Sequence, residues 1–244
     1  MGDSELRELM EEDSLSPKDK KVISETIADI AHQLRTPLTT INLLVSLIQK
    51  RGLEETKKQA YIQEINTHLA RLDWLITALL RMSKIDAGTA DFKHDKVELS
   101  DLIAQAAEPL MIQMELHSQV FDFSSGGRES FIGDINWSKE ALGNIIKNCM
   151  EHTPDGGHIS VIGRETGEYT EIEVTDTGRG IDPEDLPHIF DRYYRGKNST
   201  GQQGAGIGLA LTKKIINQQN GEITAENREK CGAKFVIRFN KHDE

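Results

Sequence analysis

The chain has 244 residues, a formal net charge of −11 and 28% charged residues, which leaves room for two modest domains. This acidic balance argues against a nucleic-acid partner, because nucleic-acid-binding faces are basic. Two cysteines far apart in sequence fit a reducing compartment, and neither a signal peptide nor an apolar run of about 18 residues is found, so we expect a cytoplasmic chain as given.

The N-terminal segment of residues 1–18 is acidic and ends in the helix-start signal Ser14-Leu15-Ser16-Pro17, so it is interpreted as a linker or the tail of a signalling helix. A long helix is predicted from about 20 to 51. Its apolar residues recur at alternating spacings of three and four and so line one seam. They are Ile23, Ile27, Ile30, Leu34, Leu38, Ile41, Val45 and Ile48.

His32 lies midway between Ile30 and Leu34, so at about 100° per residue it is expected to point away from the seam, with Thr36 on the same face. Pro37 follows one turn later, and a proline within a helix costs about 3 kcal/mol. Two interpretations are open at this point. Pro37 either serves the histidine or merely bends a bundle helix.

A second long helix is predicted from about 55 to 87. Its apolar residues again alternate at spacings of three and four: Ile62, Ile65, Leu69, Leu72, Ile76 and Leu79. Two such helices joined at Gly52 form an antiparallel hairpin that cannot bury both seams alone. The sequence therefore predicts a homodimeric four-helix bundle.

Beyond Gly88 the pattern becomes mixed. Strands are predicted at 96–99, 119–123, 131–132, 158–163, 169–175, 222–226 and 233–239, and helices at 100–116, 136–152 and 207–219. Ser100 is the expected cap of the first of these helices. This order predicts an α/β sandwich with three helices on one face of a mixed sheet. The predicted domains are a linker at 1–18, a helical hairpin at 19–90 and an α/β domain at 94–244.

The predicted helix 136–152 has an apolar side and, opposite to it, a polar face formed by Asn144, Asn148, Glu151 and His152. Two carboxamides one turn apart offer oxygen ligands to a hard cation such as Mg²⁺. A plain solvated face is the alternative.

A second candidate is Asp176-Thr177-Gly178-Arg179-Gly180, directly after a β-branched strand. A carboxylate at a strand end can accept a hydrogen bond from an exocyclic amine such as that of adenine, and the glycines let the backbone approach the base. The same residues could form an ordinary turn.

The third candidate is Gly204-Ala205-Gly206-Ile207-Gly208-Leu209, which leads into a helix. Alternating glycines before a helix N-terminus offer N–H groups to phosphates, although a flexible hinge has the same pattern. The spacing fits neither the dinucleotide fingerprint nor a P-loop.

Taken together, the segments resemble the sensor histidine kinases of two-component systems over residues 20–240. Residues 32–38 resemble the H-box of that family, 144–154 its N-box, 176–180 its G1 box, 189–195 its F-box and 204–209 its G2 box. The resemblance implies a HisKA-type dimerisation hairpin followed by an ATP-binding domain of the GHKL type.

The resemblance also implies roles for single residues. His32 would accept the γ-phosphate of ATP, Arg195 would approach the transferring phosphate, and Asn148 would hold Mg²⁺. Asp176 would bind the adenine amine. The nucleotide-binding set as a whole is Asn144, Asn148, His152, Asp176, Gly178, Gly180, Ile181, Phe190, Tyr194, Gly204, Gly206, Gly208 and Leu209, of which the last three glycines form a lid based on Phe190 and Tyr194.

The implied partners are a second copy of the chain and the receiver domain of a response regulator, whose aspartate accepts the phosphoryl group. Thr36 matches the position that orients a water for dephosphorylating that regulator. The family also leaves room for a sensor region before residue 1, through which the full-length protein would be anchored in the cell membrane.

Two residues depart from the family pattern. Gln33 stands where an acidic residue commonly takes the imidazole proton, and a carboxamide cannot act as a general base. Glu151 stands where a lysine is frequent, and its role is left open. These departures favour, as an alternative, a phosphatase-biased or weakly catalytic homologue. A third interpretation is an ATPase with the nucleotide-binding fold of gyrase, Hsp90 and MutL, which hydrolyses ATP to drive a clamp. The helical hairpin that carries His32 argues against it.

Overall fold

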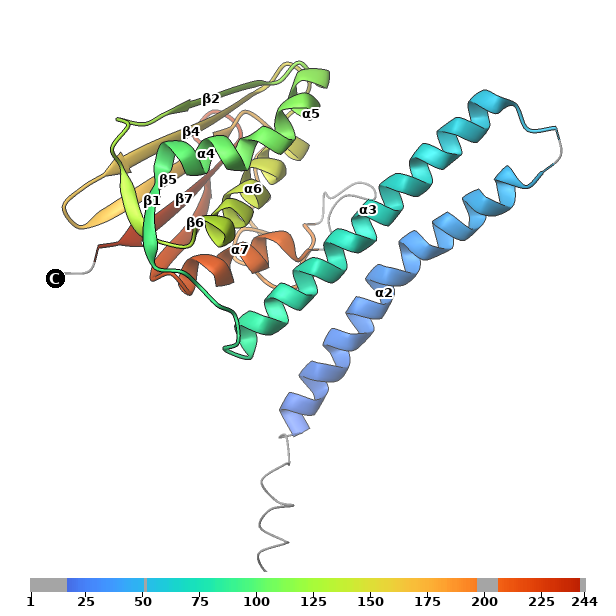
Figure 1. Ribbon diagram of the computed structural model, residues 1–244, viewed down its shortest axis with the longest axis horizontal. Coiled ribbons are helices and arrows are strands. Elements are labelled where there is room, and N and C mark those ends of the chain that lie inside the picture. Colours follow the sequence, from blue (N-terminus) through green and yellow to red (C-terminus); the bar gives the residue numbers. More distant parts are fainter. Residues whose placement is uncertain (1–16, 51, 197–205, 242–244) are drawn as a thin grey trace, which may run out of the picture. The chain divides into compact units, whose positions relative to one another are not determined.

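The computed structural model describes residues 17–50, 52–196 and 206–241; for residues 17–29 and 32 it describes the backbone alone. Most of the predicted linker at 1–18 therefore lies outside the described residues. The chain divides into two compact units, Met1–Trp74 and Leu75–Glu244. Each is described by itself below (Figure 1).

The first long helix, α2, spans Pro17–Ile48 and continues through Pro37. It begins earlier than predicted and ends three residues before the predicted end. The hydroxyls of Thr39 and Thr40 donate to the carbonyl oxygens of Arg35 and Thr36, at 2.9 and 3.2 Å. Such bonds occupy carbonyls in the turn that surrounds a proline and tend to bend a helix.

The second long helix, α3, spans Glu55–Asp86, close to the prediction. The single chain leaves many apolar side chains of the two helices exposed: Leu38, Leu43, Val45, Ile62, Leu69, Ile76 and Leu80. Pro37, Leu44, Leu75, Ala78, Met82 and Ile85 are buried instead. The apolar residues that the sequence predicted to line the seam are therefore not the ones that a single chain buries. The side chains of Ile23 and Ile27 lie outside the described part.

The last turns of α3 and the segment after it contact the helix α6, which spans Ile135–His152. The indole N–H of Trp137 donates to the carbonyl oxygen of Asp91 at 3.0 Å, and the Phe92 and Trp137 rings stack at 4.8 Å. The Arg81 guanidinium lies 5.5 Å from the Trp137 ring centroid. These contacts explain why the compact unit begins inside α3 rather than after Gly88.

Asp86, the last residue of α3, accepts hydrogen bonds from Arg192 and Lys214. Burial alone would raise the pKa of this carboxyl, but the bonds from Lys214 and Arg192 outweigh it and lower the pKa. Asp86 therefore stays ionised and ties the end of α3 to two segments of the second unit.

None of the helices in the described ranges combines the length and the apolarity that a membrane crossing requires.

The second unit is built on a mixed sheet. Its elements are β1 Asp95–Glu98, α4 Leu99–Ala107, η1 Glu108–Leu110, α5 Met111–Leu116, β2 Val120–Ser124, β3 Ser130–Gly133, α6, β4 His158–Glu165, β5 Tyr169–Asp176, α7 Gly208–Asn217, β6 Gly221–Asn227 and β7 Ala233–Asn240. The five main strands lie in the order β2-β4-β5-β7-β6. β2 runs parallel to β4, and the other neighbours are antiparallel. β1 and β3 form a separate antiparallel pair.

Helices α4, α6 and α7 cover one face of this sheet (Figure 1). Alternate strand residues such as Ile159, Val174 and Phe235 point into the layer between helices and sheet, where they are buried with Leu142 and Ile146 of α6. The predicted α/β sandwich with three helices on one face is confirmed. The apolar side of α6 packs into this core. This packing fixes the position of the opposite, polar side of α6, which carries the candidate site.

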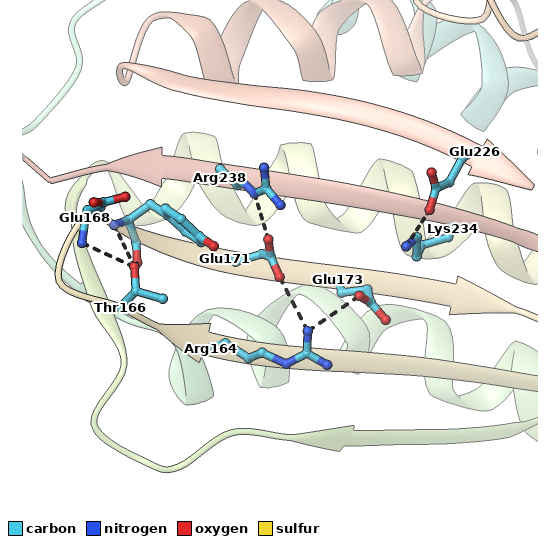
Figure 2. A network of polar contacts seen from close by, with 9 residues as sticks. Arg164, Thr166, Glu168, Glu171, Glu173, Glu226, Lys234 and Arg238 are labelled. Atoms are coloured by element: carbon cyan, nitrogen blue, oxygen red, sulfur yellow. Dashed lines mark hydrogen bonds and ion pairs between the residues drawn. The ribbon is translucent and has the colours of Figure 1, made fainter. Parts of the chain in front are cut away.

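The opposite face of the sheet carries charges instead of apolar residues (Figure 2). Glu171 of β5 accepts from Arg238 of β7 at 2.7 Å and lies 3.5 Å from Arg164 of β4, which also pairs with Glu173 at 3.7 Å. Lys234 pairs with Glu226 on the neighbouring strands. Cross-strand pairs of opposite charge favour this strand register, and their charged side chains suit a face that is exposed to solvent.

One element prediction was wrong. The helix expected at 100–116 breaks into α4, the 3₁₀ turn η1 and α5, because Pro109 lacks the N–H that would continue the helix. Ser100 is not its cap: Leu99 already belongs to the helix, and the cap residue Glu98 makes no side-chain capping bond.

Candidate functional site

The polar side of α6 forms the middle of the candidate site. Asn144, Asn148 and His152 recur every four residues, and all three side chains are half-buried. The Asn144 amide donates to the carbonyl oxygen of Gly208, the first residue of α7, at 3.5 Å. No hydrogen bond joins the Asn148 side chain to another residue in the described ranges, so its amide oxygen is available to a ligand.

The start of α6 is fixed by polar contacts. The carboxylate of Asp134 caps it by accepting from the backbone N–H groups of Asn136 and Trp137 at 2.8 and 3.1 Å. Gln219 in turn accepts from the Asp134 N–H at 2.7 Å and from the Ser138 hydroxyl at 3.1 Å. Capping of this kind contributes about 1 kcal/mol and keeps the helix, with its asparagines, in register.

Asp176 ends β5 and is only 3% exposed. Its Oδ1 accepts from the N–H of Gly178 at 2.8 Å and from that of Ala233 at 3.2 Å. A Cβ atom on Gly178 would overlap the carbonyl oxygen of His152, so the loop after Asp176 lies directly against the end of α6. Gly180 has a φ of +74°, which favours glycine. The geometry holds the carboxylate in one orientation at the end of α6.

Burial and nearby charge shift two titratable groups beside this loop. Burial, aided by the Arg179 charge, lowers the pKa of His152, although Asp176 opposes the shift. Burial and the Asp176 carboxylate raise the pKa of the Cys149 thiol well above its ordinary range. At neutral pH the site therefore contains a neutral imidazole and a protonated thiol next to the Asp176 carboxylate.

The lowered pKa of His152 gives a pH dependence of stability. Below about pH 6.5 the unfolded chain takes up a proton on this histidine before the folded chain does, so folding stability is lost as the pH falls. Replacing His152 with glutamine is expected to reduce the drop in Tm between pH 7.5 and 5.5, measured by thermal unfolding.

The matched control for this experiment is His94→Gln, because His94 is exposed. It should leave the pH dependence as in the unchanged chain. A His152→Gln variant with an unaltered dependence would contradict the role given to burial here.

The segment that precedes the glycine-rich stretch, which contains Phe190 and Tyr194, is held in place by several contacts. The Tyr194 hydroxyl donates to Asp185 at 2.8 Å, which raises the pKa of Tyr194, and the Lys213 ammonium lies 5.5 Å from the Phe190 ring centroid. The N–H of Tyr193 donates to the carbonyl oxygen of Gly206 at 2.8 Å. A Cβ atom on Gly206 would lie 2.6 Å from the Tyr194 carbonyl oxygen, so the glycine is required there. Gly204 lies outside the described residues.

Two family descriptions match this chain in tandem. Residues 22–88 match the "His Kinase A (phospho-acceptor) domain", and residues 133–243 match the "Histidine kinase-, DNA gyrase B-, and HSP90-like ATPase". Among curated proteins, the sensor protein SphS of Synechococcus elongatus is 29% identical over 86% of this chain, and the sensor histidine kinase YclK of Bacillus subtilis is 30% identical over 87%. The chain belongs to the sensor histidine kinases.

The chain spans about half the length of these relatives, 52% of SphS and 46% of YclK. Among solved structures, the histidine kinase ThkA in complex with the response regulator protein TrrA matches 92% of this chain and 64% of its own, with a TM-score of 0.72 and 22% sequence identity. That likeness concerns the fold: a helical region followed by an α/β domain.

The sequence-predicted residues of this histidine kinase fall into two groups. Asn144, His152, Asp176, Gly178 and Gly208 meet around α6 in the second unit. Asn148 lies on the same helix face, Ile181 and Leu209 are half-buried beside the two loops, and Arg195 is exposed. The predicted phosphoacceptor His32 and its neighbours Gln33 and Thr36 lie in α2, in the first unit. There Gln33 is half-buried and Thr36 is exposed, while the side chain of His32 lies outside the described part.

The sequence prediction missed a set of residues at the β6–β7 hairpin. Four residues of this hairpin contact the Asp176 loop of the kinase, although they lie about 50 positions later in the sequence: Asn227, Arg228, Gly232 and Ala233. The sequence signal was the Cys-Gly-Ala turn before a strand with alternating apolar residues, which predicts a hairpin but not what the hairpin contacts.

Proposed function

We propose that the chain autophosphorylates on His32 with ATP and passes the phosphoryl group to an aspartate of a response-regulator receiver domain. The observation that carries this proposal is the buried Asp176 carboxylate, held by two backbone N–H groups beside the polar face of α6, in a chain with both histidine-kinase domains. The regulator's dephosphorylation by the same chain is part of the proposal.

The nucleotide is proposed to lie between the Asp176 loop and the start of α7. Asp176 would accept a hydrogen bond from the adenine amine, and Gly178 and Gly180 would let the base approach the backbone. The phosphates would extend along α6 toward Gly206 and Gly208, whose N–H groups and helix N-terminus favour anions. The aromatic residues Phe190 and Tyr194, together with Ile181, His152 and Leu209, would line the borders.

Asn148, with Asn144 assisting, is proposed to be the residue that would hold Mg²⁺ beside the phosphates. The residues present fit such an ion, because Asn148 offers a half-buried amide oxygen without a partner in the described ranges and Mg²⁺ prefers oxygen ligands. The ion would supply charge neutralisation on the phosphates during transfer. Gly204, which lies outside the described residues, belongs to the same proposed phosphate-binding set.

In the transfer step an imidazole nitrogen of His32 attacks the γ-phosphorus, a P–N bond forms, and the bond from the γ-phosphorus to the leaving oxygen of ADP breaks. The proton on the attacking imidazole goes to a base or to water. Arg195 would offset the charge that develops on the transferring group. His32 and Asp176 belong to different compact units, so the step has to bring residues of both units together, and motions of whole domains commonly accompany such steps.

The proposed partners follow from the two long helices. A second copy would cover the exposed apolar residues of α2 and α3, of which Leu43 and Leu80 are the most exposed, at 58% and 60%. Thr36, exposed one turn after His32, would orient the water that hydrolyses the regulator's acyl phosphate. A membrane-anchored sensor region remains a prediction for the full-length protein.

The proposed function is tested by incubating the chain with Mg²⁺ and γ-labelled ATP. The chain should take up label that is stable in base and labile in acid, the behaviour of a phosphoramidate, and should pass it to an added receiver domain. A chain that binds ATP but never carries label would support the phosphatase-biased alternative, for which Gln33 and the Glu151 carboxylate, 3.8 Å from Lys147, are the favouring features.

Gln33→Glu is expected to raise the rate of autophosphorylation by about tenfold or more, because a carboxylate beside His32 can take the imidazole proton and a carboxamide cannot. The measurement is the initial rate of label uptake at saturating ATP. A variant no faster than the unchanged chain would contradict the reason given for Gln33.

Gln63→Glu is the matched control. Gln63 lies on the exposed side of α3, so the same change of charge there should leave the rate unchanged. Faster uptake in both variants would point to net charge rather than to proton transfer.

A further inference from the structure

The β6–β7 hairpin contacts the Asp176 loop, residues 176–181, at its far end through the side chain of Asn227. The Asn227 Oδ1 accepts from the N–H of Ile181 at 2.7 Å, and its Nδ2 donates to the carbonyl oxygen of the same residue at 2.6 Å. The carboxamide thus forms hydrogen bonds with both the N–H and the carbonyl oxygen of Ile181, as the backbone of a neighbouring β-strand would do. A Cβ atom on Gly180 would lie 2.7 Å from the same Asn227 oxygen, so the loop passes close to it.

The same hairpin holds the near end of the loop. The Arg228 guanidinium donates to the carbonyl oxygen of Asp176 at 2.8 Å, and the Arg228 N–H closes the hairpin turn on Gly232 at 3.0 Å. Gly232 has a φ of +85°, and a Cβ atom there would overlap the Asp176 backbone. The next residue, Ala233, donates to the Asp176 carboxylate.

One hairpin thus fixes residues 176 and 181, the two ends of the loop that is proposed to read the base. Hydrogen bonds at both ends restrict the backbone torsions between them, and those torsions set where the Asp176 carboxylate points. A carboxylate discriminates between bases only if it is held where the exocyclic amine arrives, since a mobile group adapts to either base.

We propose that Asn227 and Arg228 are positioning residues that set the selectivity of the nucleotide site for adenine. The proposal rests on the proposed function, in which Asp176 binds the adenine amine. Both side chains are exposed at the end of the sheet, outside the apolar core, so their contacts serve the loop rather than the packing of the domain. Neither residue is proposed to touch the reacting atoms.

The test compares ADP with inosine diphosphate, which presents a carbonyl oxygen where adenine carries the amine. Dissociation constants of both are measured by calorimetry on the full chain with Mg²⁺. Asn227→Ala is expected to weaken ADP about tenfold, because two hydrogen bonds to the loop are lost, and to leave inosine diphosphate nearly unchanged. The ratio of the two constants therefore falls about tenfold. Arg228→Ala should lower it about threefold, since one hydrogen bond is lost.

Lys230→Ala is the control, since Lys230 is exposed in the same hairpin turn; it should keep the unchanged ratio. A merely structural role for Asn227 would weaken both nucleotides alike and keep the ratio, which would overturn the proposal. If Asn227→Ala does not fold, as judged by thermal unfolding, Arg228→Ala decides by the same ratio. An unchanged chain that binds neither nucleotide would overturn the proposed function itself, and the positioning roles with it.

Discussion

His32→Ala is expected to abolish label uptake from γ-labelled ATP while leaving ADP affinity unchanged. The reason is that the imidazole supplies the only nitrogen nucleophile in the proposed reaction, and alanine offers none. Because His32 lies on α2 and the nucleotide residues lie in the second unit, the variant separates transfer from binding. The measurements are acid-labile label on the chain and a calorimetric titration with ADP and Mg²⁺.

His94→Ala is the matched control, because it removes an exposed histidine from the same chain without touching the proposed acceptor. It should keep both label uptake and ADP affinity. Label that survives in His32→Ala would refute the assignment of His32 and direct the search to another acceptor.

Asp176→Asn is expected to weaken ADP on the order of a hundredfold, because an amide N–H₂ would then face the adenine amine, donor against donor, in a buried site. The substitution keeps the oxygen that accepts from Gly178 and Ala233, so the loop and the fold should survive. The measurement is calorimetry with ADP, accompanied by thermal unfolding to show that the variant is folded.

The matched control is Asp155→Asn, which removes an exposed carboxylate that bonds to His117 at 2.8 Å. It should bind ADP as the unchanged chain does. Equal ADP affinity in Asp176→Asn would exclude the carboxylate as the group that reads the base and would place the nucleotide elsewhere.

Much of the fold could be predicted because its signals are local. Alternating apolar residues marked β4, β5 and β7, and the spacing of Leu142, Ile145 and Ile146 marked the buried side of α6 and hence its polar side. The two long helices were equally clear. The break at Pro109 was a local signal too, but the prediction did not use it.

What could not be predicted depends on contacts between segments distant in sequence. The pairing of β1 with β3 and the hydrogen bonds of Asn227 to Ile181 and of Arg228 to Asp176 join residues 32 to 52 apart, and no spacing rule connects them. The seam residues of α2 and α3 show the same limit. Periodicity marks an apolar stripe, but whether its own chain or another covers it is a question of tertiary and quaternary structure.

The contacts of the last turns of α3 with α6 bear on how this chain can be joined to another protein segment. A hybrid joined at the end of the matched phospho-acceptor domain would have its junction at Gly88. A junction there would separate Arg81 and Asp86 from Trp137, Arg192 and Lys214, with which they interact. A junction before Leu75 keeps these partners in one inherited block. The exchangeable module of this protein therefore includes three turns of a helix that the domain names assign to its neighbour.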